Sequence, residues 1–164
     1  MDNCPTVYNP DQADINNDGY GDACVSPTVV IPSGSSFGSN PVIGSGTIIK
    51  PGVTVGDNAH IGSNVTLNQN VIAGDNLTVG NGSIINKSAV ISDNVTLGSN
   101  VQIAQGVVIG SGVIIGDNTI VNQGVVIGNN AHIGTNVNIG KNAKISAGAV
   151  VPNGTKIGAG KTFP

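Results

Sequence analysis

Acidic and amide side chains gather near the N-terminus at a spacing that predicts a cation site. Asp14, Asn16 and Asp18 stand at alternate positions and Gly19 follows them, so three side-chain oxygens can face one hard cation across a tight turn. The five carboxylates before Cys24 repel one another unless an ion such as Ca²⁺ neutralises them. A solvated turn without an ion is the alternative. The predicted calcium ligands are Asp14, Asn16, Asp18, the backbone carbonyl of Tyr20 and Asp22, with Asp11 as an outer ligand or a ligand of a second ion.

Cys4 and Cys24 are the only cysteines, and they enclose the acidic segment. A loop-rich module of this size cannot build a core of its own, so a disulfide between them is the expected staple. Closing the loop between them would stabilise the module by about 3 kcal/mol. Two reduced thiols in a cytosolic protein are the alternative, whereas a zinc site would lack nearby histidines. Disulfide and calcium together favour an extracellular, cell-surface or periplasmic location.

The segment "DNCPTVYNPDQADINNDGYGDAC", residues 2–24, resembles a single thrombospondin type 3 repeat. The resemblance implies a calcium-binding module over residues 1–27. Two features depart from that family: Asn16 stands where Asp is commoner, and only one repeat is present where several are usual. Both differences imply a weaker affinity for calcium. An EF-hand is excluded because no glutamate closes the loop twelve positions on. The matching residues are Asn3-Cys4-Pro5, Asn9-Pro10-Asp11-Gln12, Asp14, Asn16, Asp18-Gly19, Gly21-Asp22 and Cys24.

The chain has two histidines, His60 and His132, and each stands in the same five residues, "NAHIG". They are far apart along the sequence and cannot share a metal ion if the chain between them is regular. An imidazole on the surface can act as a general base, but an outward strand residue without a catalytic role is the favoured interpretation.

Composition excludes several classes of function. The chain lacks Arg, Glu and Trp, and its six Lys are scattered, so no basic groove with stacking aromatics exists for nucleic acid. No apolar run approaches the ~20 residues that span a bilayer, and we predict no membrane span. Met1 precedes the acidic segment directly, so we expect any export signal to have been removed.

From Ile31 to Phe163 an apolar residue returns at every sixth position, which makes 22 complete hexads. In 21 of them the third residue after the apolar one is Asn or Gly, the types that best tolerate positive φ, and Ser88 is the exception. The next residue is small or β-branched in 19 hexads, as suits a side chain that points inward. Each hexad therefore predicts one short strand and one corner. The exceptions at the inward position are Pro41, Leu77 and Lys161.

Hexads such as "IGSNVT" and "VGDNAH" resemble the hexapeptide-repeat, left-handed parallel β-helix family over residues 31–164. The resemblance implies an all-β domain, residues 28–164, with three hexads per coil and a left-handed winding. About seven coils at ~4.8 Å each predict a rod roughly 35 Å long. Such coils would place His60 and His132 four coils apart in one outward column.

The same family includes acyltransferases, whose base is a His at a subunit interface, and zinc carbonic anhydrases that use three His. Two histidines do not satisfy the carbonic anhydrase pattern. The acyltransferases usually interrupt the repeat with a pocket-forming loop, and this repeat is uninterrupted. We therefore expect a non-catalytic structural or adhesion segment, outside the cell or on its surface, in which the calcium module caps a rigid spacer with a cell-surface or matrix partner. An acyltransferase-like enzyme is the alternative. Ice binding is disfavoured because outward threonines are few.

Two outward features are also predicted. Asp57, Asp75 and Asp93 recur at the same place in every third hexad and should form a carboxylate ladder, either solvated or holding a secondary cation. An aliphatic row between Thr54 and Lys144 should cover one face, and the family resemblance implies a homo-oligomer, most simply a trimer, that buries it. The row is Ile72, Val90, Val108 and Val126.

Overall fold

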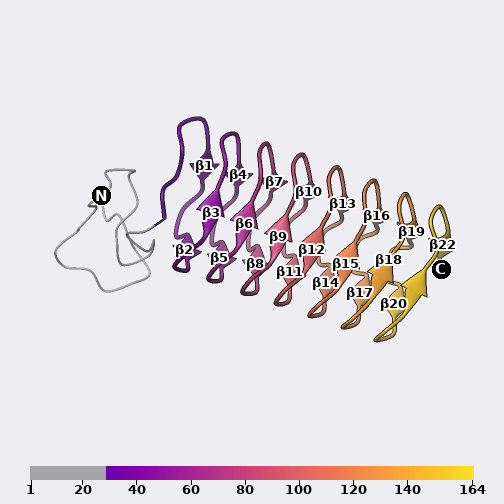
Figure 1. Ribbon diagram of the computed structural model, residues 1–164. Helices are drawn as coiled ribbons and strands as arrows, with labels where there is room; N and C mark the ends of the chain where they lie inside the picture. Colours follow the sequence, from indigo (N-terminus) through magenta and orange to yellow (C-terminus); the bar gives the residue numbers. More distant parts are fainter. Residues whose placement is uncertain (1–28) are drawn as a thin grey trace.

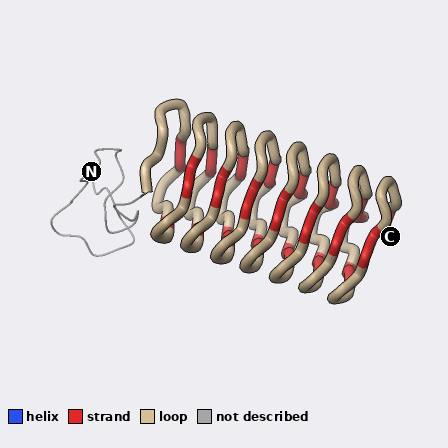
Figure 2. The backbone as a smooth tube through the Cα atoms, viewed as in Figure 1, coloured by secondary structure: helices blue, strands red, loops and turns tan. Residues whose placement is uncertain are grey.

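The computed structural model describes residues 29–164, and these form a straight rod of stacked three-sided coils (Figure 1). Its 22 strands of two residues each lie in three parallel sheets, one along each side of the rod. Figure 2 shows the strands separated by turns at three corners of every coil. The winding is left-handed with about seven turns, as the family resemblance implies.

Every strand pairs in parallel with the equivalent strands of the neighbouring coils, so each sheet collects every third strand. Sheet I has the order β1 (Ser36–Phe37), β4 (Thr54–Val55), β7 (Ile72–Ala73), β10 (Val90–Ile91), β13 (Val108–Ile109), β16 (Val126–Ile127), β19 (Lys144–Ile145), β22 (Thr162–Phe163). Sheet II has the order β2 (Val42–Ile43), β5 (His60–Ile61), β8 (Thr78–Val79), β11 (Thr96–Leu97), β14 (Ile114–Ile115), β17 (His132–Ile133), β20 (Val150–Val151). Sheet III has the order β3 (Ile48–Ile49), β6 (Thr66–Leu67), β9 (Ile84–Ile85), β12 (Gln102–Ile103), β15 (Ile120–Val121), β18 (Asn138–Ile139), β21 (Lys156–Ile157).

The core is a column of aliphatic side chains along the axis of the rod. The second residue of each strand points inward, as at Leu67, Leu97 and Ile115, and so does the residue just before the strand, as at Val65. Because equivalent positions stack one coil above another, each layer covers the next. Among the residues described, no buried side-chain polar atom lacks a hydrogen-bond partner.

Three inward hydroxyls interrupt this aliphatic column, and each donates to a carbonyl oxygen of the same rod. Thr47 Oγ1 donates to the carbonyl of Gly62 at 2.8 Å, and the hydroxyls of Ser83 and Thr119 donate to those of Gly98 and Gly134 at 2.9 Å. Buried hydroxyls that are satisfied in this way avoid the desolvation cost of an unpaired polar group.

The predicted corners are confirmed in all 22 hexads. The Asn, Ser and Gly residues at the corner position have φ between 55° and 82°, the left-handed region. Ser88 adopts φ 58° although it is neither Asn nor Gly. Of the departures at the inward position, Pro41 and Leu77 are buried, whereas Lys161 is exposed. The repeat therefore fixes the backbone even where the side chain does not fit the pattern.

The predictions for the calcium module lie outside the described residues. They concern Cys4, Cys24 and the ligand set Asp11, Asp14, Asn16, Asp18, Tyr20 and Asp22. Residues 29–164 contain no helix that could cross a bilayer.

Candidate functional site

Both histidines lie on the outer face of sheet II, His60 in β5 and His132 in β17, and both are exposed. Three strands, β8, β11 and β14, separate them. The sequence prediction of one outward column with the histidines four coils apart is confirmed. Any chemistry at one histidine is therefore independent of the other.

A shallow groove of about 340 Å³ lies around His60 and crosses β2, β5 and β8. It follows the edge where sheet II turns toward sheet III. The groove is lined by Val42, Gly44, His60, Ile61, Gly62, Ser63, Thr78, Val79 and Asn81.

Short side chains and one tight backbone approach explain why the surface is hollow here. Val42 and Thr78 are the strand neighbours of His60, and neither reaches far above the sheet. Gly44 follows the first of these strands, and a Cβ placed on it would lie 2.6 Å from the amide nitrogen of Ser63. A residue with a side chain would fit at that position only if the next coil shifted. The groove is therefore formed by the repeat itself, without an inserted loop.

Two main-chain donors of the groove are already engaged in hydrogen bonds to the next coil. Gly62 N donates to the carbonyl of Val79 at 2.8 Å, and Ser63 N donates to Asn81 Oδ1 at 2.8 Å. Within residues 29–164, no hydrogen-bond partner is present for the imidazole of His60, the hydroxyls of Ser63 and Thr78, or the Nδ2 of Asn81.

This set of groups suits transfer chemistry at a carbonyl carbon. An imidazole can take a proton from an attacking hydroxyl or amine, and hydroxyl or amide N–H donors can stabilise the oxyanion that forms. In the part of the chain that the structure describes, no group of three or more His, Cys, Asp or Glu side chains is arranged to hold a metal ion.

The predicted carboxylate ladder is present at the corner between sheets I and II. Asp57 Oδ1 accepts a hydrogen bond from Ser39 N at 2.6 Å, Asp75 Oδ1 from Asp57 N at 2.8 Å, and Asp93 Oδ1 from Asp75 N at 3.0 Å. Each carboxylate thus binds a main-chain N–H of the preceding coil, which gives these side chains a structural role. The secondary cation stays a prediction.

The predicted aliphatic row on sheet I is exposed, as expected. Its four side chains follow one another in β7, β10, β13 and β16, with Thr54 before them and Lys144 after them. The exposed fractions are 51% for Ile72, 39% for Val90, 41% for Val108 and 42% for Val126. We call these four residues the apolar strip.

Sequence comparison identifies the repeat as "Bacterial transferase hexapeptide (six repeats)", with matches over residues 34–69, 76–111, 88–123, 106–141 and 118–153. The chain belongs to this family. A search of curated proteins finds no match.

Solved structures with a similar fold include LpxA from Acinetobacter baumannii, with 20% identity and a TM-score of 0.45 over 85% of this chain and 64% of that one. LpxA from Bacteroides fragilis, a UDP-N-acetylglucosamine acyltransferase, shows 20% identity and a TM-score of 0.46 over 84% of this chain and 69% of that one. The chain thus spans less than two thirds of the length of the A. baumannii protein.

Family membership corrects the functional expectation from sequence. The main interpretation, a non-catalytic structural or adhesion segment, is wrong, because the repeat is that of a bacterial transferase family. The error came from equating an uninterrupted repeat with the absence of a pocket. Short residues and Gly44 open a groove beside His60 without any insertion. The sequence pointed to His60 but not to Ser63 and Asn81. These two residues come to the same groove because one coil contains three hexads.

Proposed function

We propose that the chain is an acyltransferase-like enzyme whose general base is His60. The observation that carries the proposal is the single groove-lining imidazole, with unpaired hydroxyl and amide groups around it, on the scaffold of a bacterial transferase family. His132 serves as the internal contrast because it shares the motif and the sheet.

In this proposal His60 removes a proton from the acceptor hydroxyl or amine as that group attacks the acyl carbonyl carbon. We propose a thioester as the acyl donor: its C–S bond breaks as the carbonyl re-forms, and the leaving thiolate takes up the proton that His60 accepted. Asn81 Nδ2 and the Ser63 hydroxyl donate to the oxyanion of the tetrahedral intermediate. The bond between Asn81 Oδ1 and Ser63 N fixes the orientation of the Asn81 amide relative to the groove.

The test is turnover of acyl-CoA thioesters against a broad panel of amine and hydroxyl acceptors. His60→Ala should lower kcat/KM by about 10²- to 10⁴-fold, the usual contribution of a general base. His132→Ala is the matched control and should leave turnover unchanged. Equal losses in both variants, or turnover that survives in His60→Ala, would refute the role of His60.

We further propose that the chain forms a homo-oligomer, most simply a trimer, through the apolar strip. A contiguous exposed aliphatic row on one sheet supports this, since such rows mark association surfaces. Val90→Asp with Val108→Asp should give soluble monomers with an unchanged β-sheet spectrum. Light scattering that reports a monomer for the unmutated chain at high concentration would contradict the proposal.

For residues 1–27 we propose a calcium-binding module closed by a Cys4–Cys24 disulfide, in an extracellular or periplasmic setting. Its support is the ligand spacing in the sequence. Calorimetry should detect calcium binding with a Kd of about 10⁻⁴ to 10⁻³ M, and Asp18→Ala should abolish it. No heat at millimolar calcium would refute the site.

A further inference from the structure

A second depression of the surface lies at the corner that leads from sheet III to sheet I. Its volume is about 190 Å³, and it extends over three successive coils. All of its lining side chains carry an amide or an ammonium group, and none is a carboxylate. The lining residues are Asn68, Gln69, Asn86, Lys87 and Gln105. We call it the Lys87 depression.

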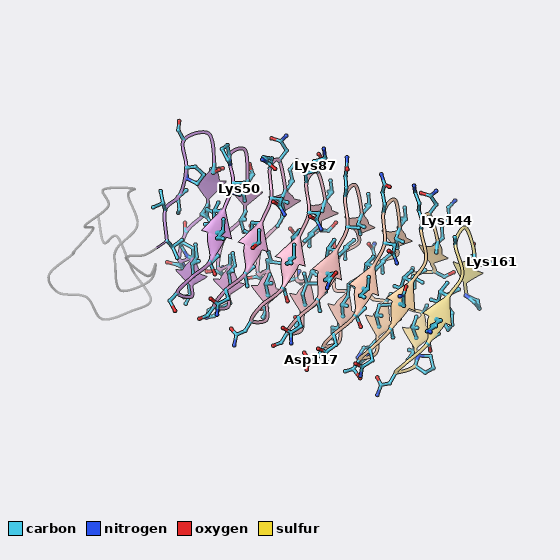
Figure 3. All side chains as sticks on the ribbon, in the orientation of Figure 1. Lys50, Lys87, Asp117, Lys144 and Lys161 are labelled. Carbon is cyan, nitrogen blue, oxygen red and sulfur yellow. The ribbon has the colours of Figure 1, made fainter. Side chains whose placement is uncertain are left out.

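The charges of the rod are sorted around its axis, and the Lys87 depression lies on the positive side. Among residues 29–164 the four aspartates all lie at the two corners that border sheet II, where no lysine is present. In Figure 3, Lys87 lies along one edge of the rod and Asp117 along another. An anion that approaches the corner between sheets III and I therefore meets an attractive field. The lysines at this corner are Lys50, Lys87, Lys141 and Lys161.

Lys87 lies between two glutamines in one column of equivalent positions. Ser88 N donates to the carbonyl of Gln69 at 3.1 Å, and Gly106 N donates to the carbonyl of Lys87 at 3.2 Å. Gln69, Lys87 and Gln105 therefore follow one another at ~4.8 Å per coil. Within the described residues, no partner is present for the Lys87 ammonium group or for the side-chain amides of the two glutamines. Three flexible donors are thus free to converge on one ligand.

The asparagines beside this column supply a fixed floor and one further donor. Asn68 Nδ2 donates to Asn86 Oδ1 at 3.2 Å and to the carbonyl of Ile85 at 3.4 Å, so both of its N–H groups are used. Asn86 Nδ2 donates to the carbonyl of Ile103 at 3.1 Å. The next residue in the column is Ala104, which has no side-chain acceptor, so the second N–H of Asn86 has no partner in the described part of the chain.

This set of donors suits a phosphate group. A lysine ammonium binds phosphate as a point charge, and each neighbouring amide N–H can bind one further oxygen. A phosphate ester presents three strong acceptor oxygens, whereas a carboxylate presents two. We propose that the Lys87 depression binds the phosphate group of a phosphorylated ligand. The donors are the Lys87 ammonium group and the side-chain N–H groups of Gln69, Asn86 and Gln105.

Two sources can supply this phosphate group: a separate phosphorylated compound, or the acyl donor if a phosphopantetheine arm carries its thioester. The second source rests on the proposed function at His60, and the first does not. Ser63 in the groove and Gln69 in the depression are six residues apart on one coil, so at most about 20 Å of chain separates them. Strand β6 crosses sheet III between them, and the strand neighbours of Thr66, Ile48 and Ile84, are exposed. An extended arm can lie across this apolar surface.

Titration of the full ¹⁵N-labelled chain with inorganic phosphate, followed by NMR at constant pH and ionic strength, tests the site. The side-chain amide signals of Gln69, Asn86 and Gln105 should shift together and saturate. A Kd of about 10⁻³ M is expected, because one exposed ammonium group supplies most of the attraction. Lys87→Gln should raise this Kd about tenfold. Glutamine is the native residue at the equivalent positions on both sides, so this change preserves the corner.

Lys141→Gln is the matched control. Lys141 occupies the equivalent position three coils further along, outside the depression, with Gln123 and Ala159 as its column neighbours. This change should leave the Kd for phosphate as it is. Shifts that do not saturate, or the same Kd in Lys87→Gln and the unmutated chain, would overturn the proposal and leave the role of His60 untouched.

A comparison of two acyl donors identifies the source of the phosphate. Acyl-CoA carries phosphate groups, and the corresponding N-acetylcysteamine thioester carries none. If the phosphate belongs to the donor, Lys87→Gln should raise KM about tenfold for acyl-CoA and leave kcat and the KM of the phosphate-free thioester unchanged. If it belongs to a separate compound, Lys87→Gln should raise the Kd for phosphate and leave both KM values unchanged.

Two further outcomes keep the proposals apart. An equal rise in KM for both donors would show that Lys87 acts on something other than a phosphate group, and would overturn the assignment. A lack of turnover with either donor would refute the proposed function alone, because phosphate binding is measured without turnover.

Discussion

The two "NAHIG" segments have identical residues, lie in the same sheet and differ only in what surrounds them. His60 has Val42 and Thr78 as strand neighbours, and a groove opens beside it. His132 has Ile114 and Val150 instead, with exposed fractions of 44% and 66%, so a valine is common to both sites and an isoleucine replaces the threonine beside the imidazole. In a solenoid the setting of a residue comes from equivalent positions one coil away, and a local motif does not define a site.

The comparison also separates scaffold from surface. Both histidines rest on the same column of inward aliphatic side chains and on corners with the same left-handed geometry. A change in the column should therefore affect both regions together, whereas a change on the outer face should affect one alone.

The largest effect is expected in the shared column. Leu97 is 1% exposed and lies in β11, midway between the two histidine strands. Leu97→Ala should lower the free energy of unfolding by about 2–5 kcal/mol, because the cavity has packed layers on both sides. Urea denaturation measures the loss. Thr96→Ala on the outer face of the same strand is the control and should cost less than about 0.5 kcal/mol. Similar losses in the two variants would mean that the column is not the source of stability.

The second prediction exchanges the surroundings of the two histidines. Thr78→Ile places beside His60 the residue type that stands beside His132, and it should lower kcat/KM by about tenfold or more by crowding the groove. Ile114→Thr, the reciprocal change, should leave turnover unaltered, since His132 is not the base. Turnover that rises in Ile114→Thr would show that both histidines can serve and would remove the contrast between them.

The sequence predicted the scaffold almost completely. The six-residue return of apolar residues and the Asn or Gly at each corner specify the strands, the inward positions and the outward strip, because a period that never shifts leaves one register. Pro41 and Leu77 broke the inward pattern and yet are buried, so neighbouring coils override a single residue. Handedness came from family resemblance alone, as right-handed crossovers are the general rule for parallel strands.

The groove was not predictable from any local pattern. The groove exists because Val42 and Thr78 have short side chains and Gly44 has no Cβ. These three residues belong to the two coils on either side of His60. Writing the sequence in rows of 18 residues, one row per coil, would have placed Ser63 and Asn81 in columns close to that of His60.

The carboxylate ladder shows the same limit of sequence reasoning. The repeat predicted that Asp57, Asp75 and Asp93 stack, and it left open whether an ion or solvent meets their charge. The main-chain N–H donors that bind these carboxylates in the structure belong to the preceding coil, so no local pattern pointed to them.

The smallest expected effect concerns a scaffold position between the two regions. Ser88 is held at φ 58°, where most L-residues with a side chain are strained, and Asn tolerates that conformation better than Ser. Elsewhere the corner asparagines also bond along the rod, as Asn58 Nδ2 does to Asn76 Oδ1 at 3.4 Å. Ser88→Asn lets Asn70 one coil below donate in the same way, so it should raise the free energy of unfolding by about 0.5–1 kcal/mol.

Ser88→Ala is the matched opposite, because alanine can neither accept that bond nor relieve the left-handed strain, and it should lower the free energy of unfolding by up to about 1 kcal/mol. Urea denaturation distinguishes the two signs. Neither variant should alter turnover at His60, since Ser88 lies at the corner between sheets III and I, away from the groove. Equal stability of the two variants would mean that the corner geometry is imposed by the neighbouring coils alone, and that side-chain bonds between the corners contribute nothing to the rod.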